Sequence, residues 1–321
     1  MPPTFISATF IDRYNNYPDL IELLRQAFAD DAIEIPDRLH YSFGSNPANR
    51  DATLLVMPAW QHGKDVGIKL VTINPGNGPL ELPAVQGNYL LLDAVTGQTR
   101  AILDGKALTR KRTAATSALA STYLSSPEAE TLLMIGTGAL APELIRAHTS
   151  VRPIKKVMIW GRDQLKARQL AESISLQDVT ILPVSDIRSY IREADIISAA
   201  TLSPNPLIFG DDLRPGQHLD LVGAYKPEMR ESDDKTARMA DLFVDTYQGA
   251  IHESGDIAIP MQKGLIQKTD ILAQLSELCQ GQHSGRYSAK SITLFKSVGY
   301  ALEDLVGARY FYDLAERQGL L

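Results

Sequence analysis

The stretch that most constrains this chain runs from Thr131 to His148, where an apolar segment, a glycine-containing turn and a helical pattern follow one another without a break. Residues 132–135 are continuously apolar, as in a parallel strand that is buried on both faces. A segment of this kind restricts the chain to an α/β fold with a tight connection between strand and helix. The turn residues that follow the strand are Gly136, Thr137, Gly138, Ala139 and Ala141.

These turn residues match the pattern G-x-G-x-x-G/A, in which each small residue has a physical role. Gly136 permits a tight turn, Gly138 lets the backbone approach a pyrophosphate, and Ala141 allows the helix to pack close to the strand. The amino end of the helix offers free N–H groups and the positive end of its dipole to phosphates. The stretch therefore predicts a dinucleotide site in a Rossmann-type domain.

A second apolar segment, 157–160, ends about 25 residues after Gly136, where the residue that reads the adenosine ribose is expected. The residues there are Gly161, Arg162 and Asp163. An NAD site would place an acidic residue here, whereas glycine followed by arginine leaves space and a guanidinium for a 2′-phosphate. We therefore predict NADPH as the cofactor, with NADH as the alternative. A solvated Arg162 and an Asp163 that caps the next helix are the alternative structural interpretation.

Strands and helices alternate from about residue 131 to 280, which predicts a doubly wound sheet. The apolar segment 195–201 ends in Ala200 and Thr201, as expected where the carboxyl end of a parallel strand meets the nicotinamide ribose. The strand expected at 218–225 places Val222 among the predicted cofactor contacts.

The first part of the chain has a different pattern. A helix is predicted at 18–29, and short strands separated by turn residues predict a mostly antiparallel sheet. The final helix, about 297–316, follows the α/β part and is expected to return to this first domain. The fold class is thus α/β, with a Rossmann-type domain at 114–293 and an α+β substrate and dimerisation domain at 1–113 with 294–321. The predicted strands of the first domain are 38–43, 53–57, 66–73, 86–93 and 99–103.

Two cations are predicted to point into apolar surroundings. Lys69 lies within the strand 66–73, which is apolar on both faces, and Arg112 falls on the inward stripe of the helix predicted at 107–124. Buried charges require partners. The partner is either a ligand carboxylate or a structural Asp or Glu of the protein itself, and the sequence leaves both open.

Composition excludes several classes of function. The net charge is −6 over 321 residues, so nucleic acid is not an expected partner. A single cysteine, Cys279, allows no intrachain disulfide and no cysteine metal cluster, and no metal site is predicted. No apolar run reaches transmembrane length and no secretory signal pattern begins the chain, so we expect no membrane partner and a cytoplasmic location.

Several segments together resemble the ornithine cyclodeaminase and μ-crystallin family, over about residues 38–314. The resemblance implies a homodimer whose first domain carries the substrate site and the dimer contact. It also implies that Arg38, Lys69 and Arg112 hold the carboxylate of the substrate; for His40, near Arg38, a structural role is the expectation. The segments that carry the resemblance are 36–38, 67–70, 92–97, 109–118, 136–139, 160–162, 222–224, 254–256 and 292–299.

One departure from the family pattern concerns the chemistry. Ornithine cyclodeaminases have an acidic residue where this chain has Tyr225. Glu228 lies three residues later and is expected to cap the following helix or to pair with Lys226 or Arg230. The segment 223–231 is instead similar to cyclic ketimine reductases, including Δ1-pyrroline-2-carboxylate and Δ1-piperideine-2-carboxylate reductases.

The resemblance implies hydride transfer from NADPH to the C=N carbon of a small cyclic imino acid, which gives L-proline or L-pipecolate. Lys69 or an ordered water is the predicted proton donor, with Tyr225 and Ser297 as secondary candidates. The alternatives are a cyclodeaminase-type lyase with resident NAD, a dehydratase of 3-hydroxyproline, a non-enzymatic binding protein like μ-crystallin, and an alanine-type dehydrogenase.

Overall fold

The structure, a computed structural model, describes residues 2–44 and 52–320 and divides the chain into two compact units. Unit 1 comprises Met1–Arg112 and Ala301–Leu321, and unit 2 comprises Thr113–Tyr300. The boundary falls inside the helix α3 (Gly105–Leu124), which belongs to both units in sequence. Within the described ranges, no helix has the length and apolarity required to cross a membrane, and no cluster of His, Cys, Asp or Glu is arranged to hold a metal ion.

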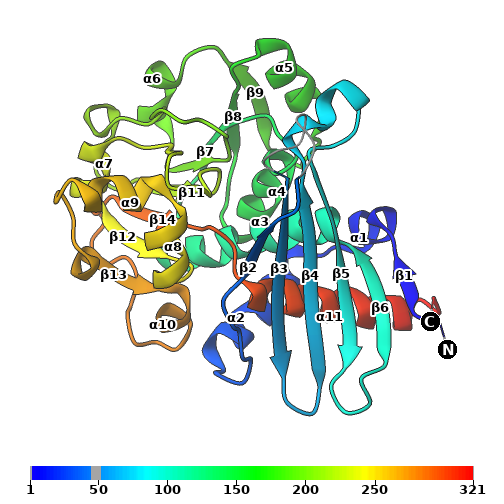
Figure 1. Ribbon diagram of the computed structural model, residues 1–321. Helices are drawn as coiled ribbons and strands as arrows, with labels where there is room; N and C mark the ends of the chain where they lie inside the picture. The colour runs from blue at the N-terminus through cyan, green and yellow to red at the C-terminus, as the bar shows by residue number, and fades with distance from the viewer. Residues whose placement is uncertain (1, 45–51, 321) are drawn as a thin grey trace. The chain divides into compact units, whose positions relative to one another are not determined.

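Unit 1 is built on a six-stranded sheet in the order β1-β6-β5-β4-β3-β2 (Figure 1). The strands pair antiparallel, except that β1 runs parallel to β6. Three helices, α1 (Ala8–Tyr14), α2 (Tyr17–Ala29) and α11 (Ala301–Arg317), complete the unit, with a 3-10 turn η2 (Pro75–Leu80) between strands. The strands are β1 (Thr4–Ile6), β2 (Leu39–Ser42), β3 (Thr53–Gln61), β4 (Asp65–Ile73), β5 (Val85–Asp93) and β6 (Thr99–Asp104).

Helix α11 covers one face of this sheet and contacts β3, β4 and β5 (Figure 1). Because side chains alternate along a strand, Gly67 and Lys69 of β4 face the helix while Ile68 and Leu70 face the other side. The approach is close at Gly67, where an added Cβ would lie 1.8 Å from the hydroxyl of Tyr89 and 2.9 Å from Leu305. The sequence therefore places a glycine where the helix and β5 converge.

Unit 2 contains an eight-stranded parallel sheet in the order β13-β12-β14-β11-β10-β7-β8-β9. Counted from β7, the run from β9 to β11 has the order 3-2-1-4-5 of dinucleotide-binding domains, the last strand of the chain, β14, takes the sixth place, and the order reverses between β7 and β10. Its strands are β7 (Thr131–Ile135), β8 (Lys156–Trp160), β9 (Thr180–Val184), β10 (Ile196–Ala199), β11 (His218–Leu221), β12 (Asp241–Val244), β13 (Ile271–Gln274) and β14 (Thr293–Lys296). Its helices after α3 are α4 (Ala141–Val151), α5 (Gln164–Ser173), α6 (Ile187–Tyr190), α7 (Asp234–Met239), α8 (Tyr247–Glu253), α9 (Gly255–Gln262) and α10 (Leu275–Cys279), with 3-10 turns η3 (Ile191–Glu193), η4 (Gly210–Asp212) and η5 (Lys268–Asp270).

The fold differs from the sequence prediction near the C-terminus. The predicted boundary at residue 293 assigned most of β14 to the first domain, whereas the structure pairs β14 with β11 and β12 inside the parallel sheet. The final helix begins at Ala301 rather than at Ser297, because residues 297–300 form the connection from that strand. The strands β1 and β13 were not predicted, since segments of three and four residues are too short to show a period.

Candidate functional site

Lys69 is a buried cation at the centre of the sheet in unit 1. Its side chain is 4% exposed and points toward α11, where Nζ lies 2.6 Å from Oδ2 of Asp304. The prediction of an inward lysine therefore agrees with its position, and the protein itself supplies one partner.

Arg112, on α3, joins the same cluster. Its Nε donates to Oδ1 of Asp304 at 2.9 Å, and its Nη1 pairs with Glu303. Both acids lie in the first turn of α11 and are fully buried. Of the two kinds of partner that the sequence left open, the structure contains the acids of the protein itself, because carboxylates of the last helix contact both inward cations.

A third predicted cation lies near this cluster. Arg38, half-buried just before β2, lies close enough to Lys69 to lower its pKa electrostatically. Lys69 and Arg112 therefore meet at Asp304, with Arg38 nearby. Such a group of ammonium and guanidinium donors suits a carboxylate.

The cluster also changes the acidity of its members. Burial, together with Arg112 and Arg38, lowers the pKa of Lys69 to about 8, although Asp304 acts in the opposite direction. Burial acts to raise the pKa of Asp304, but Arg112 and Lys69 hold it below its usual range. At neutral pH the cluster therefore contains an ionised Asp304 and a lysine that can release a proton without a strong base.

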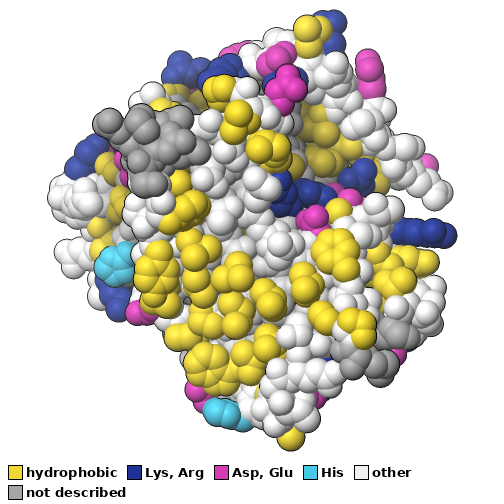
Figure 2. All heavy atoms as spheres, turned by 45° about the vertical axis from the view of Figure 1, so that its right-hand side comes forward, with side chains coloured by type: hydrophobic (Ala, Val, Ile, Leu, Met, Phe, Trp, Pro, Cys, Tyr) yellow, Lys and Arg dark blue, Asp and Glu magenta, His cyan; other side chains and the backbone are white. Residues whose placement is uncertain are grey.

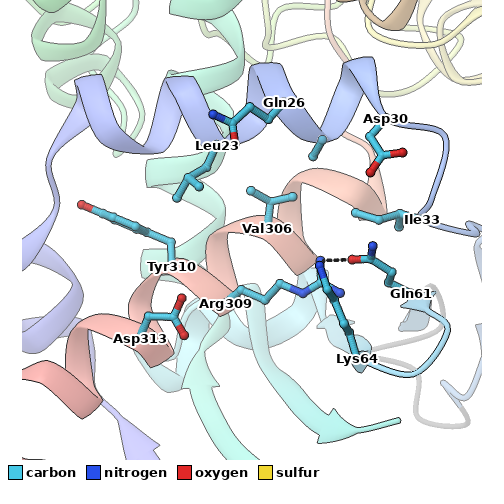
Figure 3. Close-up of a pocket in the computed structure, with 11 residues that line it drawn as sticks. Leu23, Gln26, Asp30, Ile33, Gln61, Lys64, Val306, Arg309, Tyr310 and Asp313 are labelled. Atoms are coloured by element: carbon cyan, nitrogen blue, oxygen red, sulfur yellow. Dashed lines mark hydrogen bonds between the residues drawn. The ribbon is translucent and has the colours of Figure 1, made fainter.

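A separate cavity of about 250 Å3 lies in unit 1 beside α2 and α11 (Figure 3). Arg309 extends along it and donates to Gln61 at 2.8 Å. Burial raises the pKa of Asp313, another lining residue. None of the three predicted substrate residues lines this cavity, so it is distinct from the cation cluster.

The glycine turn of unit 2 has the geometry that a pyrophosphate requires. Gly136 has a φ of +119°, and an added Cβ would lie 2.7 Å from the carbonyl oxygen of Ala200. At Gly138, by contrast, an added Cβ would meet nothing within 4 Å. No side chain caps the start of α4. The N–H groups of Ala141 and Glu143 donate to the carbonyl oxygens of Gly138 and Leu140 at 3.1 and 3.0 Å, so an anion would be bound by the turn that precedes the helix.

The end of β8 lies against this turn. A Cβ at Gly161 would lie 2.6 Å from Cγ2 of Thr137, so only glycine fits there. Arg162 is exposed, and Asp163 caps α5 by accepting from the N–H groups of Leu165 and Lys166 at 3.0 and 3.3 Å. The prediction that Asp163 caps this helix is confirmed.

Sequence reasoning missed one buried residue, Glu231, whose carboxylate contacts both Thr201 and Gly223. The expected capping or pairing role of Glu228 is not observed: it is exposed, Asp233 caps α7, and Arg230 pairs with Asp234. A signal was present in the sequence, because Glu231 lies between the apolar strand β11 and the predicted helix. Its partners, however, are separated from it by up to 30 residues.

The secondary candidates have less specific surroundings. Tyr225 is 38% exposed, and Ser297 donates its hydroxyl to Asp245 at 3.1 Å. His40 is exposed on the edge strand β2, where burial and the neighbouring Arg38 lower its pKa. His40 pairs with Leu55 of β3 in the sheet, and its expected structural role stays a prediction.

Comparison with known proteins fits this architecture. The sequence profile of the ornithine cyclodeaminase/mu-crystallin family matches residues 8–319. The chain belongs to this family. The Delta(1)-pyrroline-2-carboxylate reductase of Colwellia psychrerythraea is 36% identical over 306 residues, which cover 94% of this chain and 96% of the relative. The ketimine reductase mu-crystallin of Rattus norvegicus is 36% identical over 259 residues, which cover 80% and 79%.

A solved structure of the family is also very similar. The Thermococcus litoralis Delta(1)-pyrroline-2-carboxylate reductase in complex with NADH and L-proline superposes with a TM-score of 0.92 at 31% identity, and the alignment covers 98% of each chain. The predicted family, its ketimine reductase branch and the predicted fold class are thereby confirmed.

Proposed function

We propose that this chain uses NADPH to reduce cyclic ketimine carboxylates, Δ1-pyrroline-2-carboxylate to L-proline and Δ1-piperideine-2-carboxylate to L-pipecolate. That the enzyme is a nicotinamide-dependent imine reductase is confirmed by the relatives named above. The preference for NADPH and the acceptance of the six-membered ring are the further parts of the proposal.

The observation that carries the proposal is the buried cluster in which Lys69 and Arg112 meet at Asp304, with Arg38 close enough to lower the pKa of Lys69. A planar carboxylate is a suitable ligand for such a group, because guanidinium and ammonium donors form strong charge-assisted hydrogen bonds with it. The substrate carboxylate would thus share these donors with Asp304 and Glu303.

The residues of unit 2 fit a dinucleotide. The open space above Gly138 suits a pyrophosphate, and the exposed Arg162 suits a 2′-phosphate. When bound, NADPH supplies the hydride that reduces the imine carbon. The C=N electron pair then moves to nitrogen, which needs a proton.

Lys69 is our candidate for the proton donor. Its ammonium is buried, and its pKa of about 8 allows it to be protonated at neutral pH and still release a proton. An ordered water is the alternative donor. Arg112 and Arg38 would orient the substrate, since Arg112 is held by two acids and has little freedom to move.

The activity can be tested directly with purified protein. Oxidation of NADPH and of NADH is followed with each cyclic imine, with pyruvate plus ammonia, and with ornithine and no added reductant. The proposal predicts turnover of the imines, faster with NADPH. Formation of proline and ammonia from ornithine alone at a comparable rate would identify a cyclodeaminase and refute it.

We also infer a homodimer from the open face of the sheet in unit 1. The described part of this face carries exposed apolar side chains, and Figure 2 shows hydrophobic groups gathered on the surface. Apolar patches of this kind mark protein interfaces. The family resemblance assigns the dimer contact to the same domain. The side chains of this face include Phe5, Leu39, Tyr41, Ile68, Leu70 and Leu90.

Analytical ultracentrifugation tests the dimer. Wild-type protein is expected to sediment as a dimer, and Leu70→Arg should shift it toward the monomer because a charge replaces a 37% exposed leucine on the patch. Leu165→Arg, which changes a 69% exposed leucine on α5, is the matched control and should leave the dimer intact. A monomeric wild-type protein would contradict the inference.

A further inference from the structure

Glu231 is a fully buried carboxylate that connects the ends of two neighbouring strands of unit 2. Its Oε1 accepts from the N–H and the hydroxyl of Thr201 at 2.7 and 2.8 Å, and its Oε2 accepts from the N–H of Gly223 at 2.7 Å. Thr201 follows β10, and Gly223 follows β11. One side chain therefore fixes the carboxyl ends of both strands.

The two strand ends are in direct contact beneath this carboxylate. An added Cβ at Gly223 would lie 2.0 Å from the carbonyl oxygen of Thr201 and 2.5 Å from Oε1 of Glu231. No side chain fits between them. The bridge thus depends on glycine at position 223 as well as on the acid at position 231.

Glu231 is itself held from behind by a buried ion pair. Asp256, on α9, accepts from the N–H groups of Glu231 and Ser232 at 2.8 and 2.9 Å. Lys296, on β14, places Nζ 3.3 Å from Oδ2 of Asp256, and both side chains are completely buried. Such an arrangement leaves the Glu231 carboxylate little freedom to move.

We propose that Glu231 is a positioning residue for the nicotinamide half of the cofactor. Ligands of doubly wound sheets bind outside the carboxyl ends of the strands, and Thr201 and Val222 are the cofactor contacts predicted at these two ends. By fixing both ends, Glu231 would hold the surface against which the nicotinamide ribose lies. The inference rests on the proposed function, because it requires a nicotinamide cofactor.

The protonation state of Glu231 is expected to matter. Burial raises its pKa to about 7, with Asp256 acting in the same direction and Lys296 against it. The carboxylate accepts hydrogen bonds from three donors, the N–H and hydroxyl of Thr201 and the N–H of Gly223. A proton on one of its oxygens would point at one of these donors, and that hydrogen bond would be lost. We therefore expect cofactor affinity to fall as the pH drops below about 7.

The test is the Kd for NADPH of Glu231→Gln, measured by fluorescence titration between pH 6 and 8. The amide keeps the size of the side chain but turns a donor toward one of the N–H groups, so the Kd should rise about tenfold. Because the amide does not titrate, the weakening below pH 7 should be smaller in this variant than in the wild type. The KM for NADPH should rise more than kcat falls.

A matched control lies at the opposite end of the strands in the same sheet. Oδ2 of Asp195 accepts from the N–H groups of Glu130 and Thr131 at 2.9 and 3.0 Å, where β7 begins. Asp195→Asn removes similar backbone hydrogen bonds but lies at the amino ends of the strands. It should lower Tm without changing the Kd for NADPH.

A milder variant covers the case in which Glu231→Gln does not fold. Thr201→Val removes one hydroxyl donor to Glu231 and should raise the Kd for NADPH two- to fivefold, as expected for one hydrogen bond. Unchanged Kd values in every variant that folds would make Glu231 purely structural and overturn the inference. Wild-type protein that binds neither NADPH nor NADH would refute the proposed function, and with it this inference.

Discussion

The two units prepare for anionic ligands in opposite ways. Unit 2 uses backbone: Gly136 turns the chain at a positive φ, and Gly138 leaves open space beside a turn, 136–141, that carries no charged side chain. Unit 1 uses buried side-chain charges, and it balances most of them with acids of α11. Both arrangements avoid the free-energy cost of burying an isolated charge. The turn of unit 2 has no charged side chain, and unit 1 pairs Lys69 and Arg112 with acids.

The two sites differ in how far their geometry depends on a bound ligand. The turn in unit 2 is fixed by backbone conformation, whatever is bound. The cluster in unit 1 is an ion-pair network in which a ligand carboxylate must share Lys69 and Arg112 with Asp304 and Glu303. We therefore expect the loss of a charged side chain in unit 1 to change kcat/KM and stability strongly. In unit 2 we expect the addition of a single methyl group to change the Kd for NADPH.

The largest effect is expected from Arg112→Ala, which tests whether the cluster binds a ligand or only stabilises the fold. It should lower kcat/KM by at least about 100-fold, because a charge-assisted contact and the orientation of the substrate are lost. It should also destabilise the fold by about 3 to 5 kcal/mol, since Glu303 loses an ion-pair partner. Steady-state kinetics and thermal unfolding measure the two effects.

Arg110 provides the control for this variant, because it lies on the same helix and pairs with Asp12 near the surface. Arg110→Ala should leave kcat/KM within about twofold and stability within about 1 kcal/mol. A folded Arg112→Ala protein with near-normal kcat/KM would reassign Arg112 to a structural ion pair.

The pH dependence sharpens the role of Lys69. Its pKa is lowered to about 8, mainly by burial, so the protonated donor is present below that pH and is lost above it. The value of kcat/KM should fall about tenfold per pH unit above pH 8. In Lys69→Arg the guanidinium stays protonated and cannot donate its proton, so kcat/KM should be low throughout and this decline should disappear when it is measured from pH 6 to 10. A decline shared by both proteins would assign it to the substrate instead.

Gly138→Ala tests the backbone site of unit 2. An added Cβ meets nothing of the protein within 4 Å, so Tm should be unchanged, yet the methyl group would occupy the space predicted for the pyrophosphate. We expect the Kd for NADPH to rise more than about tenfold. Gly78→Ala, the matched control in η2, also has open space and no positive φ, and it should change neither quantity. An unchanged Kd in Gly138→Ala would show that the pyrophosphate does not bind at this turn.

The smallest effect is expected at Arg162, the cation predicted to contact the 2′-phosphate. Arg162→Ala should raise the Kd for NADPH about five- to tenfold, as for the loss of one charged hydrogen bond, and leave that for NADH within about twofold. Equal changes for both cofactors would remove Arg162 from the 2′-phosphate site. Titration of wild type and variant with each cofactor gives the two changes in Kd that are compared.

The sequence predicted the backbone site better than the charged one. The turn at Gly136 could be predicted because its chemistry lies within one continuous stretch, and the cap at Asp163 is equally local. The inward positions of Lys69 and Arg112 followed from periodicity. Their acidic partners could not be predicted, because 191 residues separate Arg112 from Glu303.

The remaining differences have the same origin. Glu231 was missed because its role depends on where β10 and β11 end in space, which no local pattern encodes. The predicted boundary before β14 was misplaced because a buried four-residue strand close to a long helix gives no signal of the sheet it joins. Pairing across long sequence separations is the information that periodicity lacks.

The central claim is that the cation cluster of unit 1 binds the carboxylate of the substrate. A crystal structure of the complex with NADPH and pyrrole-2-carboxylate, a planar acid that hydride does not reduce, tests it most directly. We expect the carboxylate of the analogue within hydrogen-bond distance of Lys69 and Arg112. Cations that contact only Asp304 and Glu303, with the analogue bound elsewhere or absent, would contradict it.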